Sequence, residues 1–208
     1  MILLAVIVAV ALLLFSTEFW WRSHKNPSEF GRKFIHISVG SFVAFWPFFL
    51  SWNQIRILSL AFLVGIGISK YFKIFQAIHS VQRPTWGEVY FALAVGSVTL
   101  VTHDKWIYAV ALLQMSLADG LAAVLGVRFG QAHRYSVLGH TKSLVGSLTF
   151  LIVSFDILLL YSVYQHTLLP VALMGLSLGA TIIENLGVSG LDNLLVPLLV
   201  ATVLSKVV

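Results

Sequence analysis

Long apolar runs separated by short polar stretches extend over nearly the whole chain. A helix that crosses a membrane needs roughly 20 apolar residues, and tilting or bilayer thinning accommodates about 17. We therefore predict an all-α fold, a polytopic bundle of about eight transmembrane helices, at residues 2–21, 34–51, 54–70, 88–102, 106–127, 144–163, 168–184 and 191–207. No soluble domain is evident, so residues 1–208 are expected to form one integral membrane domain.

Two of these predictions have alternatives. The runs 88–102 and 106–127 are separated only by His103, Asp104 and Lys105, so the alternative to eight spans is seven. The first run, residues 2–15, resembles the apolar part of a signal peptide. No basic residue precedes it, however, and an aromatic segment ending in Arg22 follows it in place of a small-residue cleavage site, which favours a retained helix.

The composition supports a membrane protein and excludes several kinds of site. Hydrophobic residues make up 59% of the chain and charged residues only 10%, whereas a soluble domain carries about 25% charged residues. The absence of cysteine excludes disulfides, zinc–thiolate sites and iron–sulfur clusters. The net charge of +5 lies in short loops between apolar runs, which indicates contact with anionic headgroups and not with nucleic acid.

The distribution of basic residues predicts an orientation. Ten basic residues lie after the first, third, fifth and seventh predicted spans: Arg22, Lys25, Arg32, Lys33, Lys70, Lys73, Arg83, Arg128, Arg134 and Lys142. Only Arg56, Lys105 and Lys206 lie on the other side. Because basic loops stay in the cytoplasm, we expect both termini outside, in a multi-pass protein of a bacterial or archaeal plasma membrane.

The first polar segment of interest on the cytoplasmic side runs from Glu29 to His36. On a helix Glu29 and Lys33 are four residues apart, as are Arg32 and His36, so the two pairs lie on neighbouring faces. The alternative for this segment is a basic anchor at the membrane interface.

Asp119 lies about eight residues, or roughly 12 Å, from the cytoplasmic end of the fifth span. A carboxylate at such a depth costs roughly 2.5–3.5 kcal/mol on insertion scales, so it marks a functional site by default. The alternatives are a buried ion pair or a protonated acid between helices. The adjacent Gly120 would allow another backbone or a ligand to approach closely.

The loop from residue 126 to residue 147 brings glycines, hydroxyls and a lysine to the start of the sixth span. A helix N-terminus presents free N–H groups and a positive dipole end, which suits a phosphate. The candidate binding residues are Gly126, Arg128, Gly130, His140, Thr141, Lys142, Ser143 and Gly146. The loop is not a Walker A motif, and its alternative is an ordinary capped helix with a snorkelling lysine.

The stretch from Glu184 to Asn193 holds two acids and two amides but no basic residue. Because hard divalent cations select carboxylate and amide oxygens, Glu184 and Asp192 are candidate metal ligands together with Asp119; a polar turn with capping residues is the alternative. Glu88, at the start of the fourth span, is explained equally well by pairing with a helix dipole. Taken together, the polar residues of this face suggest phosphoryl or nucleotidyl transfer at the membrane surface.

Four segments of the chain resemble a known family in their order and residue types. They are Arg32-Lys33…His36, Asp119-Gly120-x-Ala122-x-x-x-Gly126-x-x-x-Gly130, Lys142-Ser143-x-x-Gly146-Ser147 and Glu184…Asp192-Asn193. This order is similar to that of the CTP-dependent lipid kinases, which include dolichol kinase, phytol kinase and the yeast-type diacylglycerol kinase and are related to the phosphatidate cytidylyltransferases. The resemblance covers residues 29–197. It implies a multi-span enzyme that moves the γ-phosphate of CTP to a lipid hydroxyl with Mg²⁺.

The resemblance also implies roles for individual residues. Arg32 and Lys33 would hold phosphates, and Lys142 would contact the triphosphate. Gly126 and Gly130 would shape the nucleotide-binding turn.

Asp119 would bind the metal ion, and Glu184 and Asp192 would supply further metal ligands or the base. One position departs from the family pattern. The usual Lys-Ser/Thr-x-Glu-Gly has Val145 in place of the glutamate, so any role of that glutamate must pass to another acid.

We therefore expect a kinase for a lipid alcohol, either an isoprenoid alcohol such as a polyprenol or phytol, or diacylglycerol. A phosphatidate cytidylyltransferase is the second hypothesis, although the Ser-Pro that precedes the lysine in that group is replaced here by residues 139–141, Gly-His-Thr. A small transporter or a non-catalytic membrane protein is the third. Transporters tend to carry midplane charges and inverted repeats, and neither is apparent. Among the histidines, His36 and His140 are the two to test.

Overall fold

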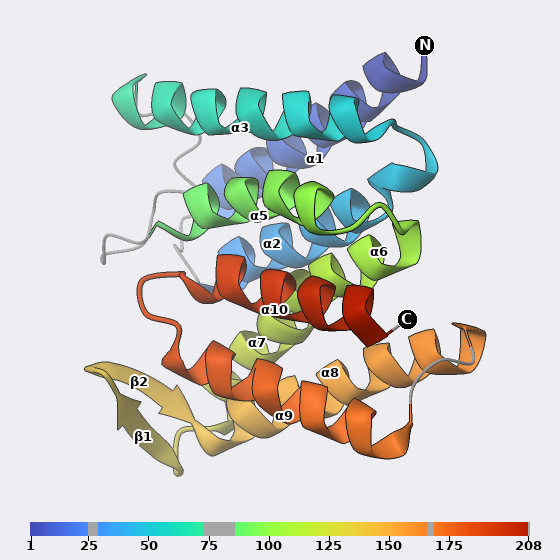
Figure 1. Cartoon of the computed structure of the whole chain (residues 1–208). Helices are drawn as coiled ribbons and strands as arrows, with labels where there is room; N and C mark the ends of the chain where they lie inside the picture. The colour runs from blue at the N-terminus through green and yellow to red at the C-terminus, as the bar shows by residue number, and fades with distance from the viewer. Residues whose placement is uncertain (25–28, 73–85, 166–168, 208) are drawn as a thin grey trace.

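The computed structural model describes residues 1–24, 29–72, 86–165 and 169–207. Within these residues the chain forms eight helical stretches (Figure 1). They are α1 (Ile2–His24), α2 (Glu29–Ala44), α3 (Trp52–Phe72), α5 (Gly87–Val101), the continuous stretch α6–η2–α7 (Lys105–Leu113, Gln114–Ala118 and Asp119–Phe129), α8 (Leu144–Gln165), α9 (Pro170–Leu186) and α10 (Asp192–Val207). Each predicted span overlaps one of them, so the all-α class is confirmed.

Length and composition qualify only some of these helices as membrane spans. Three are both long and apolar enough to cross a bilayer, at Trp52–Ser69, Lys105–Phe129 and Leu144–Gln165. Ile2–Leu13, Gly87–Val101 and Pro170–Leu186 are apolar but shorter. The number of crossings and the orientation of the termini therefore stay predictions.

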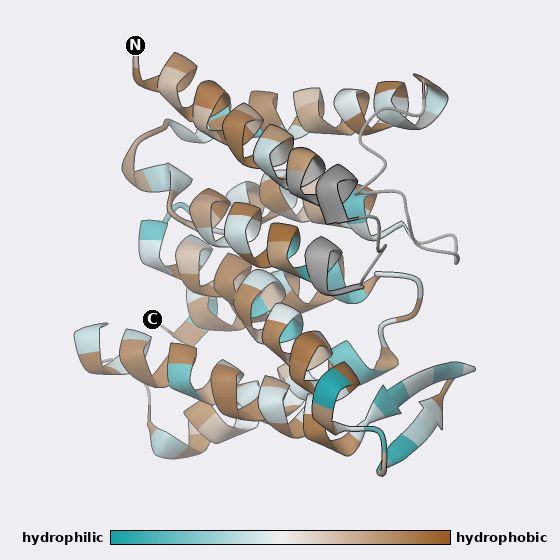
Figure 2. Cartoon of the chain, turned by 180° about the vertical axis from the view of Figure 1, so that it is seen from behind, coloured by the Kyte–Doolittle hydropathy of each residue, from teal (hydrophilic) through white to brown (hydrophobic). Residues whose placement is uncertain are grey.

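The helices form two rows that pack face to face. One row runs through α3, α5, α10 and α9, and the other through α1, α2, α6–α7 and α8 (Figure 1). Tyr108, Leu112, Phe150 and Leu158 are among the largest fully buried side chains between the rows. Many large apolar side chains are exposed, and most of the helical ribbon in Figure 2 is brown, the colour of hydrophobic residues. An outer surface of this kind is typical of a protein that is solvated by lipid.

The second helix differs from the predicted span 34–51. It begins at Glu29 and ends at Ala44, and a short 3-10 turn, η1 (Trp46–Phe48), follows it. Pro47 lies in this turn, and proline has no N–H with which to continue an α-helix and disfavours α-helical geometry in the residue before it. Because α2 begins at Glu29, Lys33 lies on the helix and not before it, and His36 lies within the helix, as the predicted span placed it.

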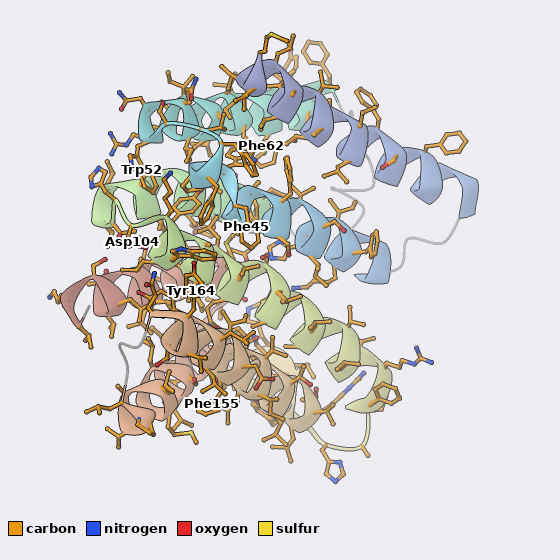
Figure 3. The ribbon with its side chains drawn as sticks, turned by 90° about the vertical axis from the view of Figure 1, so that its right-hand side faces the viewer. Phe45, Trp52, Phe62, Asp104, Phe155 and Tyr164 are labelled. Carbon is orange, nitrogen blue, oxygen red and sulfur yellow. The ribbon has the colours of Figure 1, made fainter. Side chains whose placement is uncertain are left out.

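The boundary that decides between seven and eight predicted spans, between residues 102 and 106, is a tight turn between two helices. Asp104 caps α6, because its carboxylate accepts hydrogen bonds from the N–H groups of Trp106 at 2.7 Å and Ile107 at 2.9 Å. Aromatic rings gather at this end of the bundle: Trp52 packs on His103, with ring centroids 5.6 Å apart, and Trp106 packs on Tyr164 at 4.9 Å (Figure 3). Such rings are typical of a membrane interface.

A β-hairpin occupies the opposite end, where the sequence analysis expected a loop leading into a helix N-terminus. Strands β1 (Arg134–Val137) and β2 (His140–Ser143) pair antiparallel. The two connecting residues, Leu138 and Gly139, have φ of 49° and 79°, the backbone of a tight type I′ hairpin turn. The predicted start of the sixth span is confirmed, since α8 begins at Leu144, but the residues before it form a strand in place of the expected loop. Lys142 lies on a strand.

Candidate functional site

Five elements that are distant in the sequence bring five charged side chains together. We call these the acid–lysine cluster: Lys33 on α2, Asp119 at the start of α7, Lys142 on β2, Glu184 near the end of α9 and Asp192 at the start of α10. The Lys33 ammonium donates to Asp119 Oδ2 at 2.7 Å. The Lys142 ammonium donates to the Glu184 carboxylate and, at 2.9 Å, to the Glu184 backbone carbonyl.

A π-helical turn, η2 (Gln114–Ala118), sets the position of Asp119 within the long helix. The Asp119 N–H reaches back to the carbonyl of Gln114, five residues earlier, and turns of this kind occur frequently at functional sites. Helix α2 packs against the turn, where His36 Nε2 lies 3.0 Å from the Met115 carbonyl and 3.6 Å from Asp119 Oδ2. The turn therefore aims the Asp119 carboxylate at α2.

The three carboxylates of the cluster lie close to one another. One oxygen from each of Asp119, Glu184 and Asp192 is within 4.8 Å of the other two. Asp119 and Glu184 are only 6% and 5% exposed. Asp192 Oδ1 is also buried, and it has no hydrogen-bond partner in the part of the chain that the structure describes. Three acids balanced by two lysines repel one another, and this arrangement favours a further cation.

Mg²⁺ requires oxygen ligands at short distances in octahedral geometry. Two oxygen ligands on opposite sides of Mg²⁺ are about 4.2 Å apart, twice the usual bond length. Three ligands of one octahedral ion also include neighbouring pairs about 3 Å apart, so the cluster oxygens, which lie within 4.8 Å of one another, would have to approach one another by up to about 1–2 Å to share one ion. The unpartnered Asp192 oxygen and the all-oxygen donor set fit a hard divalent cation.

Lys142 keeps a positive charge beside these acids. Its burial favours the neutral amine, but the Glu184 carboxylate, with help from Asp192 and Asp119, outweighs that effect and raises the pKa of Lys142 above its usual value. The lysine is consequently protonated at neutral pH and can neutralise a bound phosphate.

Tyr135 braces the hairpin that carries Lys142. It pairs with Lys142 across the two strands, and its hydroxyl hydrogen-bonds to Ser147 on α8 and to Asn185 on α9. Ser147 Oγ also donates to Asn185 Oδ1 at 2.9 Å. The network fixes β1 and β2 against the end of α9, beside Glu184. Sequence reasoning missed Tyr135 because it did not foresee the hairpin.

The predicted glycines bring helices close together. A Cβ on Gly126 would lie 2.8 Å from Ser143 Oγ and 3.2 Å from the Gly146 Cα, and Gly146 would meet the Ala122 carbonyl at 3.1 Å. A Cβ on Gly130 would likewise collide with the side chain of Ser143. These contacts give the glycines a packing role where α7 crosses α8. Their role in shaping a nucleotide-binding turn stays a prediction.

Gly120 and Gly190 each allow another close approach beside the cluster. Gly120 packs directly against Ile37 of α2. Gly190, with φ of 91°, packs on Gly87, and Asn193 Nδ2 donates to the Gly87 carbonyl at 3.0 Å. The connection between α9 and α10 is thus tied to the start of α5, which holds Asp192 in place.

The remaining candidate residues lie farther from the acids. Arg128 is exposed, its guanidinium lies over the Phe129 ring at 5.3 Å, and it is roughly 13 Å along α7 from Asp119. His140 is half-buried on the same face of β2 as Lys142, whereas Thr141 is exposed on the other face. The side chain of Arg32 lies outside the described residues.

Two further positions of the sequence analysis lie in first turns of helices. Val145 is half-buried in the first turn of α8. Glu88 lies in the first turn of α5, as pairing with the helix dipole requires.

The sequence of the chain is similar to that of a lipid kinase. The chain is 31% identical over 195 residues to the phytol kinase of Synechocystis sp., an alignment that covers 89% of this chain and 82% of the relative. No family model matches the chain, and no solved structure matches it. The similarity extends over nearly the full length of both proteins and supports a lipid kinase function. The chain therefore belongs to the lipid kinase family that includes phytol kinase.

Proposed function

We propose that this protein is a CTP-dependent kinase that transfers the γ-phosphate of CTP to the hydroxyl of a lipid alcohol at the cytoplasmic face of the membrane. The convergence of three carboxylates and two lysines at one end of an apolar helix bundle carries the proposal. Phosphoryl transfer needs little covalent chemistry from a protein; it needs positioning and neutralisation of phosphate charge. A cluster of acids and lysines beside the lipid supplies both.

The reaction balances without a further reactant. The lipid oxygen forms a bond to the γ-phosphorus of CTP, the bond between that phosphorus and the β–γ bridging oxygen breaks, and CDP leaves. The proton of the lipid hydroxyl passes to a base. Glu184 or Asp192 would take this proton through a carboxylate oxygen that is not bound to the metal ion.

The lysines and the other acids would act on the phosphates. In the structure Lys33 and Lys142 pair with carboxylates. Both ammonium groups are close enough to turn toward a triphosphate that is bound beside these acids. Asp119, Glu184 and Asp192 would hold Mg²⁺, which neutralises phosphate charge when bound. Arg32, one residue before Lys33, would add a further positive charge.

The lipid is proposed to be an isoprenoid alcohol, such as a polyprenol or phytol. The Synechocystis relative bears the name phytol kinase, and the apolar exterior of the bundle gives such a lipid direct access from the bilayer. Diacylglycerol is the alternative acceptor for the same chemistry.

The test uses purified protein with magnesium and CTP labelled at either the α- or the γ-phosphate. Polyprenol, phytol, diacylglycerol and phosphatidate are offered in turn. We expect label from the γ-position on an isoprenoid alcohol and none from the α-position. Label from the α-position on phosphatidate would instead mean a cytidylyltransferase. Substrate flux across sealed vesicles without nucleotide turnover would mean a transporter.

A further inference from the structure

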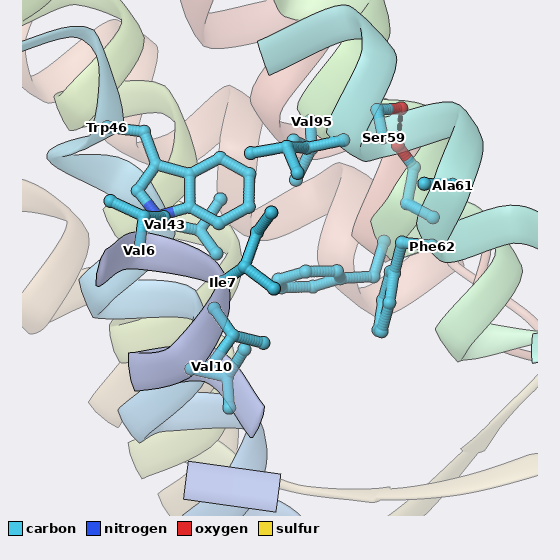
Figure 4. A pocket seen from close by; sticks show the side chains of 13 residues that line it. Val6, Ile7, Val10, Val43, Trp46, Ser59, Ala61, Phe62 and Val95 are labelled. Carbon is cyan, nitrogen blue, oxygen red and sulfur yellow. Dashed lines mark hydrogen bonds between the residues drawn. The ribbon is translucent and has the colours of Figure 1, made fainter. Parts of the chain in front are cut away.

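An apolar pocket of about 220 Å³ lies between α1, α2, α3 and α5 (Figure 4). Val6, Val43, Trp46, Phe62, Phe91 and Val95 are among the side chains that line it. The hydroxyl of Ser59, also in the wall, donates to the Ala92 carbonyl at 2.7 Å, so this hydroxyl is satisfied within the protein. The indole N–H of Trp46, another lining residue, is buried without a hydrogen-bond partner among the described residues, but the rest of the lining is apolar and suits a hydrocarbon.

Two aromatic rings, those of Phe91 and His36, lie between this pocket and the acid–lysine cluster. Phe91 lines the pocket, and its ring packs edge-on against the ring of His36, with centroids 5.5 Å apart. His36 in turn lies 3.6 Å from the Asp119 carboxylate. One end of the pocket is therefore adjacent to the proposed site of phosphoryl transfer.

From the end next to Phe91, the pocket extends along α2 toward the opposite end of the bundle. His36, Val39 and Val43 are three and four residues apart, so they lie along one side of the helix, and the distance from His36 to Val43 along the axis is roughly 10 Å. Trp46, after the end of α2, closes the far end beside Val6 (Figure 4). The residues of α2 that line the pocket, Val39 and Val43, thus lie at increasing distance from His36 along the helix.

We infer that this pocket receives the hydrocarbon tail of the lipid alcohol and thereby holds the hydroxyl end near His36 and Asp119. The inference rests on the proposed kinase function. A volume of 220 Å³ has room for roughly seven groups the size of a water molecule, at about 30 Å³ each. The pocket consequently holds the part of the tail nearest the hydroxyl, and a longer tail continues past α1, where Ile7 is 45% exposed, into the lipid.

A pair of matched substitutions on α1 tests the inference. Ile7 lines the pocket and Val8 does not, although their exposed fractions are nearly equal, 45% and 47%. In Ile7→Trp the larger side chain fills the distal part of the pocket. Displacing about two methylene groups of the tail should lower kcat/KM for phytol roughly tenfold. Transfer to a five-carbon isoprenoid alcohol, which is too short to reach Ile7, should be unchanged.

Val8→Trp is the control, and it should leave both substrates unaffected. If Ile7→Trp lowers transfer to the long and short alcohols equally, or if Val8→Trp lowers phytol transfer as strongly as Ile7→Trp does, the pocket does not bind the tail. Diacylglycerol is assayed in parallel, because selective loss of its phosphorylation would assign the pocket to an acyl chain and overturn an isoprenoid occupant.

A binding measurement separates failure of the pocket from failure of the kinase function. A phytol analogue with a photoreactive diazirine in its chain is crosslinked to the wild-type protein without nucleotide, and the labelled peptides are identified by mass spectrometry. We expect labelling of α1, α2 and α5 in the wild type and at least a fivefold reduction in Ile7→Trp, in keeping with the tenfold loss above. If the wild-type protein is labelled in this way but shows no CTP-dependent transfer, the role of the pocket in lipid binding is supported and the kinase function is refuted. Labelling confined to other helices would refute the pocket.

Discussion

The ion pair between Lys33 and Asp119 allows the structural and chemical roles of Asp119 to be separated. The two side chains are 2.7 Å apart and only 12% and 9% exposed. Removing one member of a buried pair leaves an uncompensated charge and costs about 3–5 kcal/mol. An amide at position 119 still accepts one hydrogen bond from Lys33, so we expect Asp119→Asn to cost about 3 kcal/mol, the lower end of that range.

For a chain of 208 residues this cost corresponds to a decrease in Tm of roughly 6–12 °C, at about 2–4 °C per kcal/mol. The double variant Lys33→Met/Asp119→Asn removes both charges. Because replacement of a whole buried pair is often nearly neutral, the double variant should regain most of the lost Tm. Tryptophan fluorescence on heating the detergent-solubilised protein measures both variants.

Kinase activity should not follow stability. If Asp119 acts on the phosphates or their metal ion, phosphoryl transfer should fall by about 10³-fold in both variants, the size of effect seen when one charge-stabilising group is removed from an active site. Asp156→Asn, at an exposed acid on α8, is the control and should change Tm and activity little. Recovery of activity together with stability in the double variant would refute a chemical role for Asp119.

Two further predictions concern packing and metal binding. Gly126→Ala should destabilise the protein by about 1–3 kcal/mol, because the new methyl group meets Ser143 and the Gly146 backbone. Gly175→Ala is the control: nothing lies within 4 Å of its new Cβ, so it should stabilise the protein by up to about 1 kcal/mol. Equal effects of the two substitutions on Tm would contradict the described crossing of α7 and α8. Mg²⁺ at 100 times its Kd should stabilise the wild type by about 2.7 kcal/mol in thermal unfolding. Asp192→Asn should abolish this gain, and a gain of wild-type size in that variant would exclude Asp192 as a ligand.

The helices were predictable because the signal is strong and local. A run such as residues 144–163 contains a single charged residue, Asp156, and its apolarity needs no tertiary partner to be recognised. The predicted start agrees with α8, which begins at Leu144. The boundary of α2 was less accurate, because apolarity alone excluded the charged turn that contains Lys33 from the helix.

The candidate site was predictable as a set of residues but not as an arrangement. An acid such as Asp119 within an apolar run is costly, so its presence already indicates a purpose. Its partner could not be read in the same way: Lys33 precedes it by 86 positions, and any of the basic residues on that face could have paired with it. The β-hairpin was missed because its strands are only four residues long.

The sequence by itself therefore determined the helical class, the approximate place of each helix and the polar residues that needed an explanation, because apolar length and the cost of charge in lipid are properties of short segments. The tertiary structure decided which charges meet, how Tyr135 and the hairpin hold Lys142 beside Glu184, and where a pocket remains between α1 and α5. These features depend on the approach of segments that are far apart in the chain, and that approach is set by the packing of complementary helix faces and by glycines such as Gly126 and Gly146 that allow close contact.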